Sequence, residues 1–78
     1  MSEAYVLIET TIGRTQEVVD ALRSLPGIQD VDPITGPYDI IARVFGPDHI
    51  AIGSLVATEL ATINGIARTL TCLSVGNV

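Results

Sequence analysis

The chain has 78 residues and a mass of 8.2 kDa, which fits a single domain with a small hydrophobic core. One cysteine and one histidine exclude an internal disulfide and a closed zinc site of four nitrogen or sulfur ligands, and we expect no metal and no cofactor. A net charge of -5 with four dispersed arginines disfavours direct nucleic-acid binding. No apolar run approaches the roughly 20 residues that cross a bilayer, so we expect one cytoplasmic domain, residues 1–78, that does not bind membranes.

The first half of the sequence predicts a strand, a helix and a second strand. Residues 4–11 (AYVLIETT) combine β-branched and aromatic residues, as strands do. Between about residues 14 and 25, apolar side chains recur at helical spacing, with Thr15 as the expected N-cap. Residues 28–35 (IQDVDPIT) include Pro33, which a central strand tolerates poorly. We therefore expect an edge strand with an irregularity near this proline.

After a Gly36–Pro37 turn, the second half again predicts a strand, a helix and a strand. Residues 38–45 (YDIIARVF) form the clearest predicted strand. Asp48 is expected to cap a helix that runs to about residue 63. The last predicted strand covers residues 66–75 (IARTLTCLSV).

The order strand, helix, strand, strand, helix, strand predicts an α+β fold of the ferredoxin-like type, βαββαβ. Two βαβ halves joined by a hairpin close most simply into a four-stranded antiparallel sheet with both helices on one face.

Both faces of this predicted sheet carry apolar side chains. In the third strand, Ile40 and Val44 alternate with Ile41 and Phe45, so neither register is polar. Two short helices cover only one face of such a sheet. We therefore predict an obligate dimer in which two sheets pack face to face.

Few residues stand out as chemical groups. His49 is expected to be a surface residue at the start of a helix, and Cys72 a small buried thiol in the last strand. Arg43, on the same strand face, is a candidate ion-pair partner for the Asp39 carboxylate, which otherwise is available to a ligand cation. No glycine-rich phosphate-binding pattern occurs in the sequence.

A pair of threonines is the remaining candidate for a functional group in this sequence. Thr69 and Thr71 lie two positions apart in the last predicted strand and are expected to point to one face. Their hydroxyl groups then offer hydrogen bonds together, although threonine is common in strands for its propensity alone.

Taken together, these segments resemble the ligand-binding domain of the Lrp/AsnC family, also called the RAM domain. The resemblance covers nearly the whole chain, from AYVLIETT through LPGI, PITGPYDI and NGI to ARTLTCLSV. The most specific part is TG-x-YD between two helix-glycine-aliphatic junctions, closed by RT-x-T.

This resemblance implies an amino-acid effector domain without enzymatic activity, which dimerises through its sheet. It implies that dimers assemble further, often into an octamer-type ring, with effectors bound where dimers meet. Gly36, Tyr38 and Asp39 carry over as ligand-binding residues, and Thr69 and Thr71 carry over by the closing motif. Asp39 is expected to bind the ligand ammonium, and the threonine hydroxyls and N–H groups near Gly36 the carboxylate.

Full-length relatives of this family carry an N-terminal helix-turn-helix. Because the first predicted strand starts four residues into this sequence, we expect a stand-alone form that acts without its own DNA-binding element. It then regulates transcription by joining a full-length relative, or senses an amino acid without DNA.

Two other functions remain open at this stage. Small dimeric ferredoxin-like enzymes, such as monooxygenases and isomerases, have a similar length and also stack their sheets. A metal-responsive or metabolite-binding module of the ACT type shares the order of elements, but it does not predict the Tyr-Asp hairpin.

Overall fold

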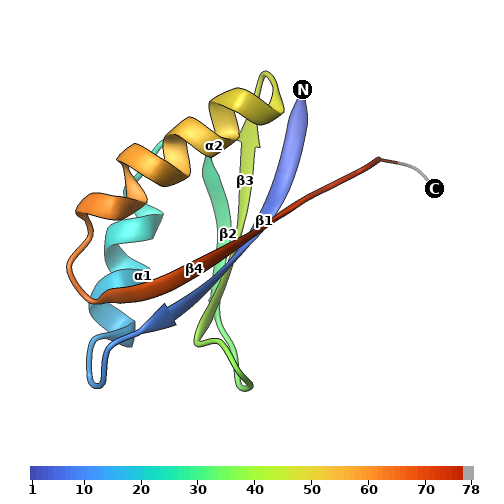
Figure 1. The fold of residues 1–78 in the computed structure, drawn as a ribbon. Helices are drawn as coiled ribbons and strands as arrows, with labels where there is room; N and C mark the ends of the chain where they lie inside the picture. Colours follow the sequence, from blue (N-terminus) through green and yellow to red (C-terminus); the bar gives the residue numbers. More distant parts are fainter. Residues whose placement is uncertain (77–78) are drawn as a thin grey trace.

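The computed structural model describes residues 1–76 and has the predicted ferredoxin-like order βαββαβ (Figure 1). Four strands and two helices make up this order, and a short 3-10 turn follows the second helix. They are β1 (Ser2–Thr10), α1 (Thr15–Arg23), β2 (Ile28–Pro33), β3 (Ile40–Gly46), α2 (His49–Thr58), η1 (Leu60–Thr62) and β4 (Ile66–Leu73).

The four strands form one antiparallel sheet in the order β2-β3-β1-β4, with α1 and α2 on the same side of it (Figure 1). β2 is an edge strand, as its proline predicted. Its irregularity lies between Gln29 and Asp32, before the proline, and Asp30 there has a positive φ of 49°. Aspartate tolerates this left-handed conformation better than bulkier residues do, which favours a bulge at this place.

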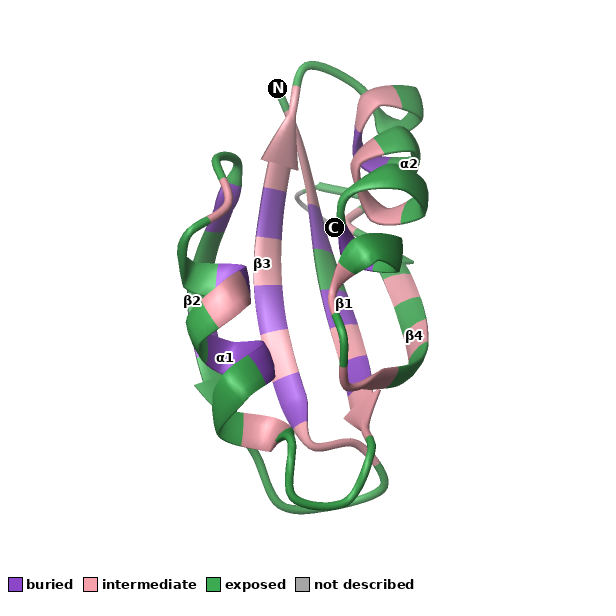
Figure 2. Cartoon of the chain, turned by 90° about the vertical axis from the view of Figure 1, so that its left-hand side faces the viewer, coloured by how far each residue is buried: buried purple, intermediate pink, exposed green. Residues whose placement is uncertain are grey.

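The core lies between the helices and the inner face of the sheet. Alternate residues of the two central strands are fully buried there, which produces the alternating colours of β1 and β3 in Figure 2. From α1, Val18 and Leu22 pack onto them, one helical turn apart as the sequence predicted. Each such large aliphatic side chain contributes about 1.5–3 kcal/mol when it leaves water. The buried residues of these two central strands are Ala4, Val6, Ile8, Ile40, Ala42 and Val44.

The outer face of the sheet carries no helix, and we call it the open face. Its side chains alternate with the buried ones and stand opposite each other in the strand register. Tyr5 and Leu70 are 39% and 46% exposed, and Leu7 and Phe45 are half-buried. The open face therefore holds large apolar side chains in contact with solvent. Its members from β1, β3 and β4 are Glu3, Tyr5, Leu7, Glu9, Ile41, Arg43, Phe45, Arg68, Leu70 and Cys72.

The helix ends agree with the sequence in one case and differ in two. The Asp48 carboxylate accepts a hydrogen bond from the Ala51 N–H at 2.8 Å and caps α2 as predicted. Thr15 is the first residue of α1 and not its cap, because its hydroxyl contacts Thr10 instead. α2 ends at Thr58 and not near residue 63, since the chain tightens into η1 with i→i+3 bonds. Among residues 1–76, no helix is long and apolar enough to span a membrane.

The turn before β4 brings its glycine against α1. Gly65 has a φ of +101°, and a Cβ atom at this position lies 2.9 Å from the Arg14 Cβ and 3.0 Å from a Val18 methyl group. Both the backbone conformation and the close approach therefore require glycine here.

We expect Gly65→Ala to lower the free energy of unfolding by about 1–3 kcal/mol because it strains the backbone and crowds α1. Urea denaturation at fixed protein concentration measures this loss. Gly53→Ala is the matched control: Gly53 lies in α2 with no atom within 4 Å of its Cβ position, so alanine should stabilise by about 0.5–1 kcal/mol. Equal stability of the two variants would contradict the close approach of Gly65 to α1.

Candidate functional site

The loop between β2 and β3 is the first part of the candidate site. The sequence predicted a strand from residue 38, but β3 begins at Ile40, and Tyr38 and Asp39 belong to the loop. Gly36 has a φ of +150° and is exposed. The loop is closed at its base, because the Ile34 N–H donates to the Asp39 carbonyl at 2.8 Å and the Asp39 N–H donates to the Ile8 carbonyl at 2.9 Å. Tyr38 and Asp39 are therefore held beside the end of β1.

The Asp39 carboxylate is bound to β1. Its Oδ2 accepts hydrogen bonds from the Thr10 N–H at 2.8 Å and from the Thr10 hydroxyl at 3.1 Å. In the β1–β3 ladder, Ile8 pairs with Ile40 and faces β3, so Thr10, two residues further on, points its N–H to the same side. β3 does not extend this far, because it begins at Ile40. The Asp39 carboxylate takes the place of the missing strand carbonyl, and its orientation is fixed as a result.

This network continues into the first helix. The oxygen atoms of the Thr10 and Thr15 hydroxyls lie 2.8 Å apart, and Thr15 begins α1. No sequence signal pointed to Thr10, because a threonine at a strand end is ordinary. Its role follows only from the residue at which β3 begins, Ile40.

Arg43 is not the partner of Asp39, and that expectation was wrong. Arg43 pairs with Glu3 on β1, at 2.8 Å and 2.9 Å, and with Asp30 on β2, at 2.6 Å. The hydrogen bond to Glu3, opposed by desolvation and supported by Asp30, raises the pKa of the Arg43 guanidinium above its ordinary value. Its side chain also lies over the Phe45 ring at 5.0 Å. β3 lies between β1 and β2, and each of these strands supplies one carboxylate to Arg43. Both carboxylates are far from Arg43 along the chain, so the sequence did not indicate them.

Tyr38 has a cationic neighbour from the opposite sheet edge. The Arg68 guanidinium carbon lies 5.7 Å from the centre of the Tyr38 ring, within the range of a cation–π contact. Arg68 also forms a long ion pair with Glu9, with 3.4 Å between Nε and the carboxylate oxygen. Arg68 belongs to the RT-x-T motif, for which the sequence predicted a role of the two threonines only. The fold thus adds a cation to the candidate site.

Thr69 and Thr71 share one face, as predicted, but not the face of Arg68. They stand opposite Ile8 and Val6, whose side chains point to the helices. β1 also separates β4 from β3. The structure therefore brings Tyr38, Asp39, Thr10 and Arg68 to one corner and does not bring the threonine pair to the same corner within one chain.

Thr69 instead lines an apolar groove between α2 and β4, with a volume of about 310 Å³. The wall on the helix side comes from α2 and η1, and the other wall comes from the edge strand. The lining residues are Val56, Ala57, Leu60, Ala61, Ile66, Ala67, Arg68 and Thr69. A small aliphatic group fits such a lining better than a charged one.

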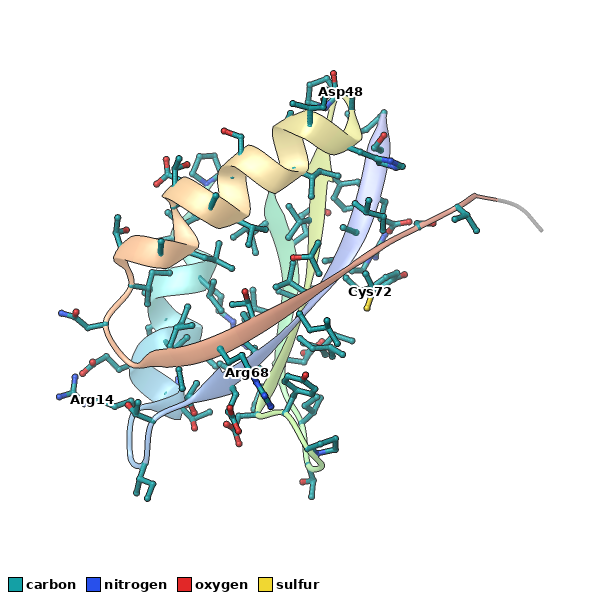
Figure 3. All side chains as sticks on the ribbon, viewed as in Figure 1. Arg14, Asp48, Arg68 and Cys72 are labelled. Carbon is teal, nitrogen blue, oxygen red and sulfur yellow. The ribbon has the colours of Figure 1, made fainter. Side chains whose placement is uncertain are left out.

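Cys72 and His49 occupy different surroundings from those of the corner. Cys72 is exposed and not buried, because it lies on the open face of the edge strand β4, opposite Tyr5 (Figure 3). His49 is exposed at the first residue of α2, as predicted. Neither residue belongs to the cluster around Asp39.

The double hydrogen bond from Thr10 makes Asp39 important for stability. We expect Asp39→Ala to lower the free energy of unfolding by about 1–3 kcal/mol, because the Thr10 N–H loses its acceptor in a partly buried place. Chemical denaturation measures the change. Asp39→Asn keeps an acceptor oxygen and should lose less.

Asp32→Ala serves as the control for this variant. Asp32 is exposed on the edge strand β2 and forms no side-chain hydrogen bond or ion pair within residues 1–76, so its removal should leave the stability nearly unchanged. An Asp39→Ala protein as stable as Asp32→Ala would refute the structural role of the Asp39 carboxylate.

Solved structures share this fold over nearly the whole chain. TTHA0845 from Thermus thermophilus is 32% identical, with a TM-score of 0.93, 100% of this chain covered and 98% of that one. AsnC of E. coli is 21% identical, with a TM-score of 0.90 over 97% of this chain and 52% of its own. A transcriptional regulator from Neisseria meningitidis, solved as a complex with L-Met, is 16% identical, with a TM-score of 0.86 over 99% of this chain and 51% of its own. The last two likenesses show the fold alone.

Two transcriptional regulators are similar to this chain in sequence. An uncharacterized HTH-type transcriptional regulator of Pyrococcus furiosus is 32% identical over 74 residues, which cover 91% of this chain and 49% of the regulator. A similar regulator of Pyrococcus horikoshii is 31% identical over the same shares. The chain thus spans about half the length of the curated relatives it matches. The family model of the Lrp/AsnC ligand binding domain matches residues 3–78. This chain belongs to the Lrp/AsnC family, and it comprises that family's ligand binding domain.

Proposed function

We propose that this protein is an amino-acid effector module of the Lrp/AsnC type, which binds its ligand at the β2–β3 loop and assembles through its sheet. The observation that carries this proposal is the corner formed by Tyr38, Asp39 and Arg68 in a chain that matches the family's ligand binding domain over residues 3–78. An aromatic ring, a fixed carboxylate and a cation around one loop complement a zwitterion. The L-Met complex of the Neisseria meningitidis regulator, a protein of the same fold, is consistent with this ligand class.

Asp39 is the proposed acceptor for the ligand ammonium. Thr10 occupies its Oδ2, and within residues 1–76 no hydrogen bond reaches the Oδ1 atom. A carboxylate held by two donors on one oxygen is pre-oriented for a cation at the other, which lowers the entropy cost of binding. Gly36 offers a backbone N–H in the same loop, while Pro37 lacks one.

We propose that Thr69 and Thr71 contact the ligand from a neighbouring copy of the chain. They belong to an edge strand and are separated from Asp39 by β1, so their hydroxyls cannot meet the loop within one protomer. A neighbouring copy with its β4 edge at the loop supplies them. The effector then bridges two copies, and its binding favours their association by mass action.

The apolar part of the open face, formed by Tyr5, Leu7, Ile41, Phe45 and Leu70, is the proposed dimer interface, and Arg68 lies outside it on the edge strand β4. Apolar side chains from β1, β3 and β4 are exposed or half-buried there, although the chain has only a small core. Packing two such faces removes these side chains from water at about 25 cal/mol per Å² of apolar area. We propose that the dimers form a higher, octamer-type assembly and can join full-length relatives that bind DNA.

Enzymatic activity receives less support than effector binding. The relatives are transcriptional regulators, and the groove between α2 and β4 is lined mostly by aliphatic side chains rather than by acid–base pairs.

A ligand screen tests the proposed function directly. We expect at least one of the twenty amino acids, at millimolar concentration, to raise the melting temperature of the wild-type protein, because a ligand of the native state at about 100 times its Kd adds about 2.7 kcal/mol. Differential scanning fluorimetry measures the shift. If none of the twenty changes the melting temperature, the amino-acid effector proposal is wrong.

The substitution Leu7→Lys tests the proposed dimer. Leu7 lies on the central strand β1, between Ile41 and Leu70 across the open face, so a lysine there buries an unpaired charge in the dimer but reaches water in the monomer. We expect sedimentation at low micromolar concentration to show an oligomer for the wild type and the 8.2 kDa monomer for the variant.

Ile50→Lys is the matched control for the dimer test. Ile50 is 83% exposed on α2, on the helix side of the sheet, so the same substitution there should leave the assembly intact. A Leu7→Lys protein that remains an oligomer would exclude the open face as the interface.

A further inference from the structure

The four arginines differ in how far this chain satisfies their donors. Arg43 binds two carboxylates, Arg14 binds Glu17 at 2.9 Å, and Arg23 donates to the Val31 carbonyl at 2.9 Å. The side chain of Arg68 donates no hydrogen bond within residues 1–76, since its approach to Glu9 at 3.4 Å is an ion pair only. It is 64% exposed. A guanidinium with five N–H donors is therefore held in place without using them.

Tyr38 fixes the position of this guanidinium. A contact with an aromatic ring at 5.7 Å involves the charge of the guanidinium and leaves its N–H edge available to a planar anion. Glu9 contributes from the side of β1, where it stands opposite Arg68 in the register. The β2–β3 loop, through Tyr38, and the central strand β1, through Glu9, thus hold Arg68 from two directions. Figure 3 shows its side chain beside β4, on the side away from α2.

The charges at this corner have a definite pattern. Among residues 1–76, Arg68 is the one cation of the corner, where Glu9 forms an ion pair with it and Asp39 accepts hydrogen bonds from Thr10. The chain as a whole carries a net charge of -5, which repels free anions. A carboxylate ligand therefore needs a local cation, and a zwitterion meets both signs at once.

We infer that Arg68 is a ligand-binding residue that receives the carboxylate of the effector through a charge-assisted, two-pronged hydrogen bond, and that Tyr38 positions it. This inference rests on the proposed effector function and names the chemical class: a small molecule with a free carboxylate. It assigns carboxylate recognition to a side chain on the open side of β4, whereas the threonine hydroxyls lie on its helix side. A planar guanidinium matches a carboxylate in geometry, which a hydroxyl does not.

The experiment combines a change in the protein with a change in the ligand. Isothermal titration measures the Kd of the amino acid found in the screen, and of its primary amide, for the wild type, Arg68→Gln, Arg68→Lys and Arg14→Gln. The amide keeps the shape and the ammonium but removes the anionic charge. Arg14→Gln is the matched control, because it removes the same charge from another exposed ion pair, on the N-terminal side of α1.

We expect Arg68→Gln to weaken binding of the amino acid by at least about tenfold to a hundredfold, since each hydrogen bond to a charged group has an effect of this size. The amide should bind the wild type with a similar loss, and Arg68→Gln should no longer distinguish acid from amide. Arg68→Lys keeps the positive charge but lacks the planar pair of N–H donors, so it should bind the amino acid more tightly than Arg68→Gln and less tightly than the wild type. Arg14→Gln should bind both ligands as the wild type does.

Two results would overturn the inference while leaving the proposed function intact. One is an Arg68→Gln protein that binds the amino acid as tightly as the wild type. The other is an Arg68→Gln protein that still prefers the acid to its amide by the wild-type ratio. By contrast, a wild-type protein that binds no amino acid at all contradicts the proposed function itself. Urea denaturation of Arg68→Gln should give near-wild-type stability, as expected for an exposed side chain with no hydrogen bond.

Discussion

Two helices of nine and ten residues cover only one face of a four-stranded sheet, and most of the other features follow from this limit. The inner face holds the whole core within residues 1–76, and every buried residue there is apolar. The open face retains large apolar side chains such as Tyr5 and Leu70. A chain of this size cannot add a third layer of its own, which explains why a second copy is the simplest cover.

The place where β3 begins has a similar effect on the candidate site. Because the strand starts at Ile40, the Thr10 N–H of the neighbouring strand has no carbonyl to meet, and the Asp39 side chain satisfies it. An unsatisfied N–H in a partly buried place costs free energy, so this arrangement stabilises the loop and orients its carboxylate at once. Stability and the geometry of the site therefore depend on the same hydrogen bond.

Arg43 and Arg68 show how the fold gives one residue type two uses. Arg43 lies on a central strand, where carboxylates from both neighbouring strands saturate it. Arg68 lies on the edge strand β4, where only β1 is a neighbour, and its donors remain available. A cation with neighbours on both sides becomes part of the scaffold, while one at an edge can serve a ligand. The difference comes from strand order alone.

The sequence by itself determined the order of elements, the ferredoxin-like fold, the edge position of β2, the Asp48 cap and the family, because periodicity, capping and turn signals are local. Local signals also indicated the two apolar sheet faces. Tertiary structure decided which residues meet: Asp39 with Thr10 rather than Arg43, Arg43 with Glu3 and Asp30, and Tyr38 with Arg68 across β1. These pairs depend on the order of the strands in the sheet and on the residues at which each strand begins and ends. Spacing along the chain contains neither quantity, since a sheet brings together residues from distant segments.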